Sequence, residues 1–544
     1  MTSLSHAETI PSLLADRAKL GAHAAIVDGG TVISYRDLEQ RVHEVARAYL
    51  AHDVRRGDRV AVWAPNRAEF ILAMLGAQSI GAAVVPLNTR YTGHEAAVIM
   101  SRSRATALVL ADGFLGRSFS TMLRDAAAEL GVEGSAMPGL PALRLVVAMD
   151  DAPTGPVSSG WTDFLASGAA VPDDELRAAL DAVTRDDVVD VLFTSGTTGV
   201  PKGVMSAHRQ TIGVARDWAD GADLTADDRY AVVNPFFHGF GYKAGMISSL
   251  VAGTTIYPLA TFDPEQLLEL IQAERITVLP GVPTIFTTLL DHPRRREFDL
   301  SSLRFAIAGA TAAPETLFHD MVHVLGFERV AQAYGLTECV VATLSRPGED
   351  LDHASQTTGP ATASTEIRIV DPSGNEVPVG EDGEILLRGD NVMLGYFEDE
   401  EATRAVVDDE GWFHTGDIGR LDEHGCLKIT DRLKDMFIVG GFNVYPAEVE
   451  NVLRQHPAVN ESAVIGVDDA RLGAVGVAYV ALLHDASPRP DAADLIAFCR
   501  ERLANFKVPR DVVIVDEFPR NATGKILKTQ LRSMSSGATE VQPA

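Results

Sequence analysis

The sequence contains little cysteine, no excess of basic residues and no long uninterrupted apolar segment. Its three cysteines, Cys339, Cys426 and Cys499, are too few and too scattered for a disulfide framework or a zinc site, which favours a reducing cytoplasm. Lysine and arginine number 47 against 75 aspartate and glutamate residues, and the formal net charge is -28. We therefore expect no basic face for nucleic acid or for an anionic membrane surface.

The longest apolar segment, residues 70–87, is interrupted by Gln78 and Ser79. It predicts a buried helix that leads into a strand, so no integral membrane span is expected. The first eight residues lack the basic and apolar regions of a secretory signal. With 544 residues, of which 46% are hydrophobic, the chain has material for about two to four domains with large cores.

Short apolar runs alternate with helical periodicity over residues 20–345, which predicts an α/β fold with mainly parallel strands. One helix is expected at Asp263-Pro264, where a capping residue precedes a proline at the first helical position. Residues 358–430 have the turns of an antiparallel β subdomain, and the residues after 431 have the texture of a small α+β unit. The strands expected in the first region are 60–63, 83–86, 107–110, 188–193, 230–233, 254–257, 278–280 and 305–308.

The most informative segment runs from Thr194 to Gly203, between the predicted strand 188–193 and a helix expected near Ser206. Its three glycines, four hydroxyl groups and one lysine suit a triphosphate held by backbone N–H groups and side-chain hydroxyls. Most loops of this composition are only flexible connectors, so the position between strand and helix matters to the interpretation. It is not a Walker loop, because Lys202 has no hydroxyl residue directly after it.

Five further segments stand out along the chain. They are NPFFHGFG at 234–241, QAYGLTE at 332–338, TGD at 415–417, DRLKD at 431–435 continuing to GGFNVYP at 440–446, and PRNATGK at 519–525. Together with the loop at 194–203, and in this order and spacing, they resemble the acyl-adenylate-forming enzymes. That superfamily comprises acyl-CoA synthetases, adenylation domains of peptide synthetases and luciferases. The resemblance covers about residues 10–532.

The resemblance implies a large N-terminal domain of α/β layers plus a β subdomain, followed by a small, mobile C-terminal α+β domain. The corresponding boundaries are 1–431 for the AMP-binding domain, 432–434 for a hinge and 435–544 for the C-terminal domain. Lys434 matches the family's hinge, where the small domain turns between an adenylating and a thioester-forming pose. In the second pose, a hairpin at Gly440-Gly441 would replace Lys525 at the active site and shape the thiol channel.

Two side chains in these segments carry chemistry that their residue types suggest. Glu338 offers a carboxylate in a turn beside Thr337, which suits Mg²⁺ shared with phosphates. Asp417 has two acceptor oxygens for the two ribose hydroxyls. On residue type alone, Glu338 could equally be an exposed glutamate, Tyr334 a core tyrosine and His238 a packed or surface histidine.

The resemblance gives these residues roles. It places Thr337 at the α-phosphate, Tyr334 against the adenine, and Arg432 at the ribose or a phosphate. It also places His238 at the wall between the acyl pocket and the pantetheine channel. The other residues that it implies for the nucleotide and the pocket are Thr194, Ser195, Gly196, Thr197, Thr198, Gly199, Lys202, Gly309, Ala310, Thr311, Gln332 and Gly335.

Lys525 is the residue on which the rate should depend most. Attack of a carboxylate on the α-phosphate brings two anions together, and an ammonium group that bridges them stabilises the transition state. Without Thr523-Gly524 before it, Lys525 would be interpreted as a solvated lysine near the end of the chain. Magnesium and Lys202 would neutralise the departing pyrophosphate.

The predicted function is ATP-dependent ligation of a carboxylic acid to coenzyme A through an acyl-AMP intermediate, with ATP, Mg²⁺ and coenzyme A as cofactors. Aromatic and apolar residues in the segment 234–246 predict an apolar acyl pocket; they are Phe236, Phe237, Phe240, Tyr242 and Met246. Residues 234–245 are similar to ligases that act on bulky alicyclic propanoates from bacterial steroid-ring breakdown, and fatty-acid ligases are close rivals. Aromatic acids rank behind both.

Two other classes of function stay open. The protein could be a stand-alone adenylating enzyme that loads a carrier protein, or a non-catalytic nucleotide-binding module. The sequence leaves the pathway, regulation by lysine acylation and the oligomeric state open, with a homodimer as one alternative.

Overall fold

The computed structural model describes residues 4–128, 137, 139–150, 158–194, 201–309, 313–432, 435, 437–439, 442–444, 446–469, 472–484, 486–503, 505–520 and 526–537. The chain forms two compact units. The first comprises residues 1–367, 387–413 and 424–427, and the second comprises 368–386, 414–423 and 428–544. Among the described residues, no helix combines the length and the apolar character needed to cross a membrane.

An eight-stranded sheet forms the centre of the first unit, with the strand order β18-β9-β8-β4-β3-β5-β6-β7. The strands from β8 to β7 run parallel to their neighbours, whereas β9 is antiparallel to both β8 and β18. The predicted parallel α/β arrangement is therefore confirmed for most of this sheet. The strands are β3 (Arg59–Trp63), β4 (Ala83–Pro86), β5 (Ala107–Leu110), β6 (Leu145–Ala148), β7 (Ser159–Gly160), β8 (Val188–Thr194), β9 (Lys202–Ala207) and β18 (Gly395–Tyr396).

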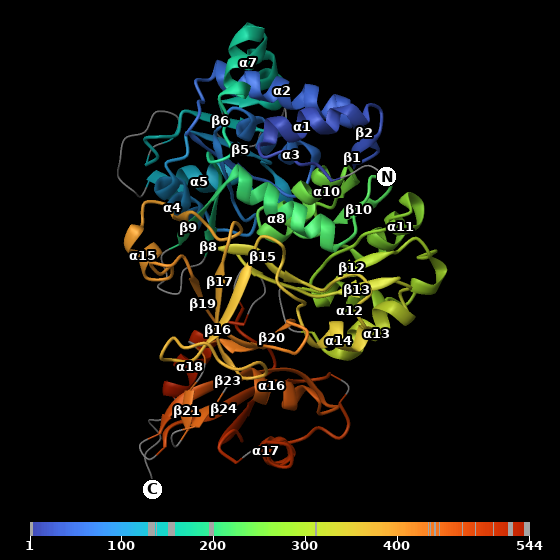
Figure 1. Cartoon of the computed structure of the whole chain (residues 1–544), viewed down its shortest axis with the longest axis vertical. Coiled ribbons are helices and arrows are strands. Elements are labelled where there is room, and N and C mark those ends of the chain that lie inside the picture. The colour runs from blue at the N-terminus through green and yellow to red at the C-terminus, as the bar shows by residue number, and fades with distance from the viewer. Residues whose placement is uncertain are drawn as a thin grey trace. The chain divides into compact units, whose positions relative to one another are not determined.

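Helices cover both faces of this sheet, as its strand sequences require (Figure 1). In β3, Val60 and Val62 join the core formed with α2 (Tyr35–Ala51), α3 (Ala68–Ser79) and α8 (His208–Gly221). Ala61 and Trp63 face the opposite core, formed with α4 (Gly93–Ser103) and α5 (Phe119–Ala128). Alternate side chains of a strand point to opposite faces, so a strand that is apolar throughout needs two covering layers. The apolar segment 70–87 belongs to α3 and β4, as predicted.

A second sheet lies across the layer of α2, α3 and α8 in the same unit. It has the order β10-β11-β1-β2, and isolated bridges at Val278 connect it to the pair β12-β13. Ile256 and Phe305 face the core shared with α2 and α3, whereas Tyr257 and Ala306 face the outer helices. The strands are β1 (Ala24–Asp28), β2 (Thr31–Ser34), β10 (Arg229–Val232), β11 (Thr255–Pro258), β12 (Phe305–Ile307) and β13 (Arg329–Ala331). The outer helices are α11 (Pro264–Glu274), α12 (Pro283–Asp291) and α13 (Glu315–His323).

The helix predicted at Asp263-Pro264 is confirmed as α11, because the Asp263 side chain accepts a hydrogen bond from the Gln266 N–H at 2.9 Å. The remaining elements of the first unit are short. They are the helices α1 (Ile10–Arg17), α6 (Trp161–Ser167), α7 (Asp173–Asp181), α9 (Gly239–Gly241), α10 (Ser248–Ala252), α14 (Leu351–Gln356) and α15 (Glu400–Arg404), with the strands β14 (Ala333–Leu336) and β15 (Cys339–Leu344).

The second unit contains most of a four-stranded sheet, β16-β17-β19-β20, and a five-stranded sheet with the order β22-β21-β24-β23 and β25 beside β24. The first sheet matches the predicted β subdomain, and the second matches the predicted α+β unit. Its strands are β16 (Glu366–Val370), β17 (Gly383–Arg388), β19 (Phe413–Leu421), β20 (Leu427–Arg432), β21 (Phe437–Val439), β22 (Phe442–Val444), β23 (Val459–Asp469), β24 (Gly473–Leu482) and β25 (Asp511–Ile514). Its helices are α16 (Pro446–Arg454), α17 (Ala492–Arg500) and α18 (Lys528–Gly537).

Candidate active site

The predicted phosphate loop connects two antiparallel strands. Thr194, the last residue of β8, pairs with Lys202, the first residue of β9. The helix that we expected near Ser206 was therefore placed too early, because residues 202–207 pair along β8 and α8 begins at His208. Residues 195–200, which include the predicted Ser195, Gly196, Thr197, Thr198 and Gly199, lie outside the described residues.

Lys202 and Glu338 are brought together by an aromatic residue that the sequence analysis missed. The Lys202 ammonium lies 4.8 Å from the centre of the Tyr396 ring, and the Tyr396 hydroxyl donates to Glu338 Oε1 at 2.8 Å. Burial, with the Glu338 carboxylate beside it, raises the pKa of Tyr396, so the phenol keeps the proton that it donates. Tyr396 is held here because β18 pairs with β9, opposite Val204.

The segment 332–338 forms a hairpin with β15. Tyr334 pairs with Thr343 across the hairpin, and Thr337 and Glu338 form the turn between β14 and β15, as predicted. Gly335 is required here, since a Cβ atom at this position would lie 1.9 Å from the Val340 carbonyl oxygen. The Tyr334 ring is largely covered by protein, with an exposed fraction of 8%.

Gln332, at the start of the same segment, is fixed by backbone contacts. Its side-chain Nε2 donates to the carbonyl oxygens of Ala354 and Ser355, at 3.2 and 2.6 Å, and its N–H donates to Ser345 Oγ at 3.1 Å. The hairpin is therefore tied to helix α14 through one amide side chain.

The segment 234–246 contributes fewer residues to an accessible pocket than we expected. Phe236, Tyr242 and Met246 are 0% exposed and belong to the core beneath α2 and α3, so they cannot line an open acyl pocket. Phe240 is only partly buried, and a Cβ atom on Gly309 would lie 3.8 Å from its ring. Phe240 and Gly309 are thus neighbours. The predicted Ala310 and Thr311 lie outside the described residues.

His238 caps the single turn α9, where its Nδ1 accepts the Phe240 N–H at 3.3 Å. The side chain is exposed to solvent, yet the surrounding protein atoms desolvate it enough to lower the pKa of the imidazole.

A buried polar network lies behind the phosphate loop. The Lys243 ammonium donates to Ser206 Oγ at 2.7 Å and lies 3.2 Å from Asp190 Oδ1, with both charged side chains almost fully covered. Thr211 Oγ1 donates to Asp190 Oδ2 at 2.7 Å. Desolvation lowers the pKa of Lys243, and Asp190 beside it acts in the opposite direction. Because Asp190 is in β8 and Ser206 in β9, the network fixes both strands that carry the loop.

In the second unit, Asp417 of the Thr-Gly-Asp motif lies within strand β19. Its exposed fraction is 3%, and its N–H donates to Thr415 Oγ1 at 3.0 Å. The Gly416 backbone has φ +67°, which interrupts the regular strand conformation just before the carboxylate. The Thr415 hydroxyl also donates to the Ile385 carbonyl at 2.8 Å, which ties this bend to β17.

The remaining predicted residues of the second unit are only partly placed. Arg432 is the last residue of β20. Strands β21 and β22 pair in the antiparallel sense, with Val439 opposite Phe442. Gly440, Gly441, Lys434 and Lys525 themselves lie outside the described residues.

No local pattern in the sequence marks Tyr396, because its place beside Lys202 and Glu338 depends on the pairing of β18 with β9. A surface cavity of about 630 Å³ lies elsewhere, next to α2 and α3, with Asp28, Glu44, Glu69 and Trp161 among its lining residues. None of the predicted site residues lines it.

The described donor set fits a magnesium–nucleotide complex. Glu338 Oε1 is engaged by Tyr396, and a carboxylate has a second oxygen for a hard cation such as Mg²⁺. Lys202 adds a positive charge on the same side of the hairpin, where a polyphosphate needs it. Such an arrangement can hold a nucleotide and neutralise charge on its phosphates. It supplies no general base, and a carboxylate nucleophile is already ionised near neutral pH.

Comparison with known proteins agrees with this site. Residues 15–397 match the family described as "AMP-binding enzyme", and residues 448–525 match the "AMP-binding enzyme C-terminal domain". The solved structure of ATP-bound MatB from Rhodopseudomonas palustris is similar to this chain with a TM-score of 0.84. The two are 30% identical, over 98% of this chain and 100% of MatB.

Two curated relatives share about half of their residues with this chain. One, from Rhodococcus jostii, is named "3-[(3aS,4S,7aS)-7a-methyl-1,5-dioxo-octahydro-1H-inden-4-yl]propanoyl:CoA ligase", and it is 49% identical over 96% of this chain and 98% of its own length. A protein of the same name from Mycobacterium tuberculosis is 48% identical, over 97% and 99% respectively. The chain therefore belongs to the AMP-binding enzyme family.

Proposed function

We propose that this ATP-dependent acid–CoA ligase acts on a propanoate carried by a fused bicyclic ring system. The observation that supports this substrate most directly is the near-full-length similarity, at 49% and 48% identity, to two ligases named for a bicyclic propanoyl group. The apolar environment around Phe240 and Gly309 is compatible with such an acid, because a fused ring buries apolar surface in the site.

The reaction has two steps. The acid carboxylate attacks the α-phosphorus of ATP, the bond to the β-phosphate breaks, and acyl-AMP and pyrophosphate form. The thiol of coenzyme A then attacks the acyl carbon, and the bond between that carbon and the bridging oxygen breaks. AMP leaves with the bonding electrons, and the thiol proton is released. Mg²⁺ neutralises phosphate charge when it is bound.

Residues of the first unit hold the nucleotide in this proposal. Thr194 and Lys202, with the loop 195–199 between them, bind the phosphates, and Thr337 contacts the α-phosphate. Glu338 holds Mg²⁺, and the Tyr396 hydroxyl orients its carboxylate by donating to Oε1. The other residues assigned to the nucleotide and acyl pockets are Gly309, Ala310, Thr311, Gln332, Tyr334, Gly335 and His238.

Residues between 415 and 525 supply the remaining groups in this proposal. Asp417 binds the ribose hydroxyls, Arg432 binds the ribose or a phosphate, and Lys525 bridges the carboxylate and the α-phosphate. We place the domain boundaries at 1–431 and 435–544, with residues 432–434 as the hinge. Gly440-Gly441 then enters the site for the thioester step.

The test is a comparison of acids with purified protein, ATP, Mg²⁺ and coenzyme A, followed as AMP formation. The panel contains the bicyclic dione propanoate, a medium-chain and a long-chain fatty acid, and ferulic acid. We expect the highest kcat/KM with the bicyclic acid. A preference for a fatty or aromatic acid would overturn the proposed substrate but leave the ligase activity intact.

Two controls separate the rival classes. Acid-dependent exchange of pyrophosphate into ATP without coenzyme A detects adenylation alone, and its absence with every acid would exclude the ligase. AMP release that does not depend on coenzyme A would instead indicate an enzyme that loads a carrier protein.

A further inference from the structure

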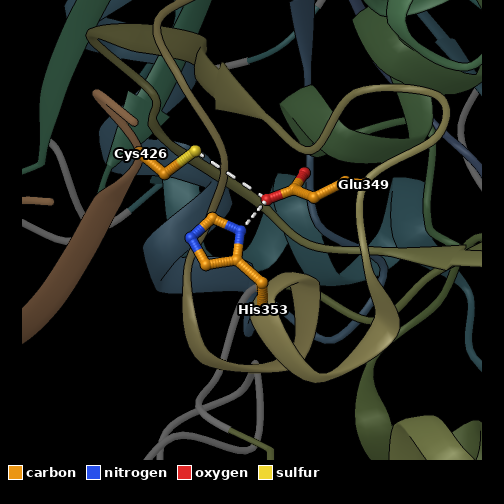
Figure 2. A group of neighbouring side chains, drawn as sticks. All are labelled: Glu349, His353 and Cys426. Atoms are coloured by element: carbon orange, nitrogen blue, oxygen red, sulfur yellow. Dashed lines mark hydrogen bonds and ion pairs between the residues drawn. The ribbon is translucent and has the colours of Figure 1, made fainter. Parts of the chain in front are cut away.

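Three side chains with different donor atoms meet in the first unit. Glu349 and His353 lie four residues apart at the start of helix α14, and Cys426 comes just before β20. Glu349 Oε1 is 2.6 Å from His353 Nδ1 and 3.8 Å from Cys426 Sγ. Figure 2 shows the imidazole and the thiol directed at this same carboxylate oxygen. The ligand atoms of all three residues lie within 4.8 Å of one another.

The cluster is mostly enclosed, and His353 is its most exposed member. The side chain of Glu349 has an exposed fraction of 12%, that of His353 has 30%, and Cys426 is buried. The ring of His424 meets the His353 ring edge-on, with 5.5 Å between the centroids. The donor atoms are therefore shielded from bulk water but within reach of a small ion.

The carboxylate of Glu349 is held in place from behind. Its Oε2 accepts the Arg346 N–H at 3.1 Å, which leaves Oε1 toward His353 and Cys426. Such an outer hydrogen bond orients a ligand and is typical of metal sites.

The neighbouring acidic residues are engaged elsewhere. Asp350 caps α14 by accepting the N–H groups of Asp352 and His353, and the Asp352 carboxylate pairs with His319 at 3.0 Å. The convergent set therefore contains one oxygen, one nitrogen and one sulfur donor. It is not a cluster of carboxylates.

This mixture of donors discriminates between cations. Zinc and similar borderline ions take thiolate, imidazole and carboxylate ligands together, whereas Mg²⁺ and Ca²⁺ prefer oxygen alone. A tetrahedral Zn²⁺, with bonds of about 2.0 Å to nitrogen and oxygen and about 2.3 Å to sulfur, holds its ligand atoms about 3.3 to 3.7 Å apart. The present O···S distance of 3.8 Å is close to this range, and the O···N distance of 2.6 Å must widen by a small side-chain rotation.

We propose that Glu349, His353 and Cys426 bind a zinc-type divalent cation through Oε1, Nδ1 and Sγ, with a fourth position open to solvent. Binding replaces the proton of the Cys426 thiol by the cation, and the imidazole binds through its unprotonated Nδ1. The spacing in the sequence argued against a zinc site, and it is the fold that brings Cys426 to residues 349 and 353.

The site joins two segments that already share backbone hydrogen bonds. The Thr358 N–H donates to the Leu427 carbonyl at 2.7 Å, and the Leu427 N–H donates to the Gly359 carbonyl at 2.9 Å. Helix α14 has a further contact, because the Ser355 carbonyl oxygen accepts a hydrogen bond from Gln332 Nε2. A bound ion would therefore clamp the chain that leads into β20 to the helix that supports the 332–338 hairpin. Its role is structural, and it stabilises the first unit.

Cobalt(II) is the probe that tests the site, because a Co²⁺–thiolate bond gives a charge-transfer absorption in the near ultraviolet. Metal-free full-length protein without an affinity tag is titrated with Co²⁺, and Zn²⁺ is then added in competition. We expect one Co²⁺ per chain, a thiolate band that saturates at that ratio, and loss of the band on addition of one equivalent of Zn²⁺. No thiolate band in the wild-type protein would overturn the proposal.

Four variants locate the site. Cys426→Ser should abolish the thiolate band, and His353→Asn should weaken Co²⁺ binding by at least the roughly 10-fold loss seen when metal-site partners are removed. The controls are Cys499→Ser, a buried cysteine of the second unit, and His319→Asn, a histidine outside the donor set, and both should retain the band. A band that survives Cys426→Ser, or that disappears with Cys499→Ser, would overturn the assignment.

Thermal unfolding gives a second readout that does not depend on ligase activity. Zn²⁺ at saturating concentration should raise the Tm of the wild-type protein and leave that of His353→Asn unchanged, whereas Mg²⁺ alone should not discriminate between the two. An equal Zn²⁺ shift in both proteins would contradict the clamp. Since neither experiment uses the acid or ATP, the metal site and the proposed substrate are tested separately.

Discussion

The two units of the chain hold their buried charges in different surroundings. In the first unit, the side chains of Lys243 and Asp190 are 2% and 0% exposed, between strands that are covered on both faces. In the second unit, Lys528 and Glu450 form an ion pair at 2.8 Å whose side chains are 21% and 15% exposed. Desolvation is large for the Lys243–Asp190 pair and moderate for the Lys528–Glu450 pair. Loss of one partner should therefore lower the free energy of unfolding more in the first unit than in the second. The first unit thus has the rigid support that a nucleotide site needs.

Tryptophan allows the units to be followed separately. The four tryptophans, Trp63, Trp161, Trp218 and Trp412, all belong to the first unit. Intrinsic fluorescence therefore reports on unfolding of that unit alone, and hydrogen exchange along β23 and β24 reports on the second.

The largest effect on stability is expected for Lys243→Met. This change leaves Asp190 buried without its cation, and such losses amount to about 3–5 kcal/mol. Fluorescence-detected urea unfolding should measure it. The double variant Lys243→Met/Asp190→Asn removes both charges and keeps an acceptor for Thr211, so it should lose less than the sum of the two single variants. Simple additivity would show that the pair is not coupled.

The largest effect on rate is expected in the second unit. Lys525→Ala should slow acyl-AMP formation by about 10²–10³-fold, because it removes a charge that stabilises the transition state. The same variant should still convert supplied acyl-AMP and coenzyme A to the thioester. Lys528→Ala, a neighbouring lysine paired with Glu450, is the matched control and should retain adenylation. Equal loss in both half-reactions would contradict the role of Lys525.

The stability of the first unit should depend on pH because of its buried histidine, His208. His208 accepts the Ile10 N–H through Nδ1 at 3.1 Å, and burial lowers its pKa to about 4. Its stabilising effect is complete above the unfolded pKa of about 6.5 and is lost as the pH falls toward the folded value. Between pH 7 and pH 5 the wild-type protein should therefore lose about 2 kcal/mol that His208→Asn does not lose. Parallel losses in the two proteins would rule out this histidine as the source.

The proposed hinge at residues 432–434 offers a smaller, selective effect. Lys434→Pro restricts the backbone at the proposed hinge, where a fixed φ hinders rotation of the small domain. We expect the thioester-forming step to slow several-fold while adenylation changes less. Single-turnover measurements of the two half-reactions give the ratio, and identical slowing of both would argue against a hinge at 432–434.

Sequence reasoning placed the elements with strong local signals. Strands such as β4 and β5 matched their predicted limits, because they are short apolar runs bounded by turns. The hairpin β8–β9 was missed, since the run Gly203–Ala207 has no alternating pattern and its pairing with β8 is a tertiary contact. Phe236, Tyr242 and Met246 were expected in a pocket and lie in the core, because composition does not tell which face of a segment is buried.

The residues of the candidate site also divide into those with a local sequence signal and those that only tertiary contacts identify. The motif residues Thr194, Lys202 and Glu338 were identified from their own segments, and the fold brings the last two to one aromatic ring. Tyr396 was missed because its role depends on strand β18 crossing to β9 from nearly two hundred residues away. Cys426 was dismissed for the same reason, since 77 residues separate it from Glu349. Contacts of this kind are fixed by topology, which no local pattern carries.

The smallest effect on stability is expected for the ion pair between Lys528 and Glu450 in the second unit. Lys528→Met should destabilise the second unit by only about 1 kcal/mol, because its partner is not left without hydrogen bonds. Glu450 Oε1 also accepts the Val464 N–H at 2.7 Å, and the carboxylate keeps access to water. Hydrogen exchange at β23 and β24 measures the change, and the fluorescence transition of the first unit should not move. A loss as large as that of Lys243→Met would mean that the two units bury charge under the same constraint, which would remove the distinction drawn between them.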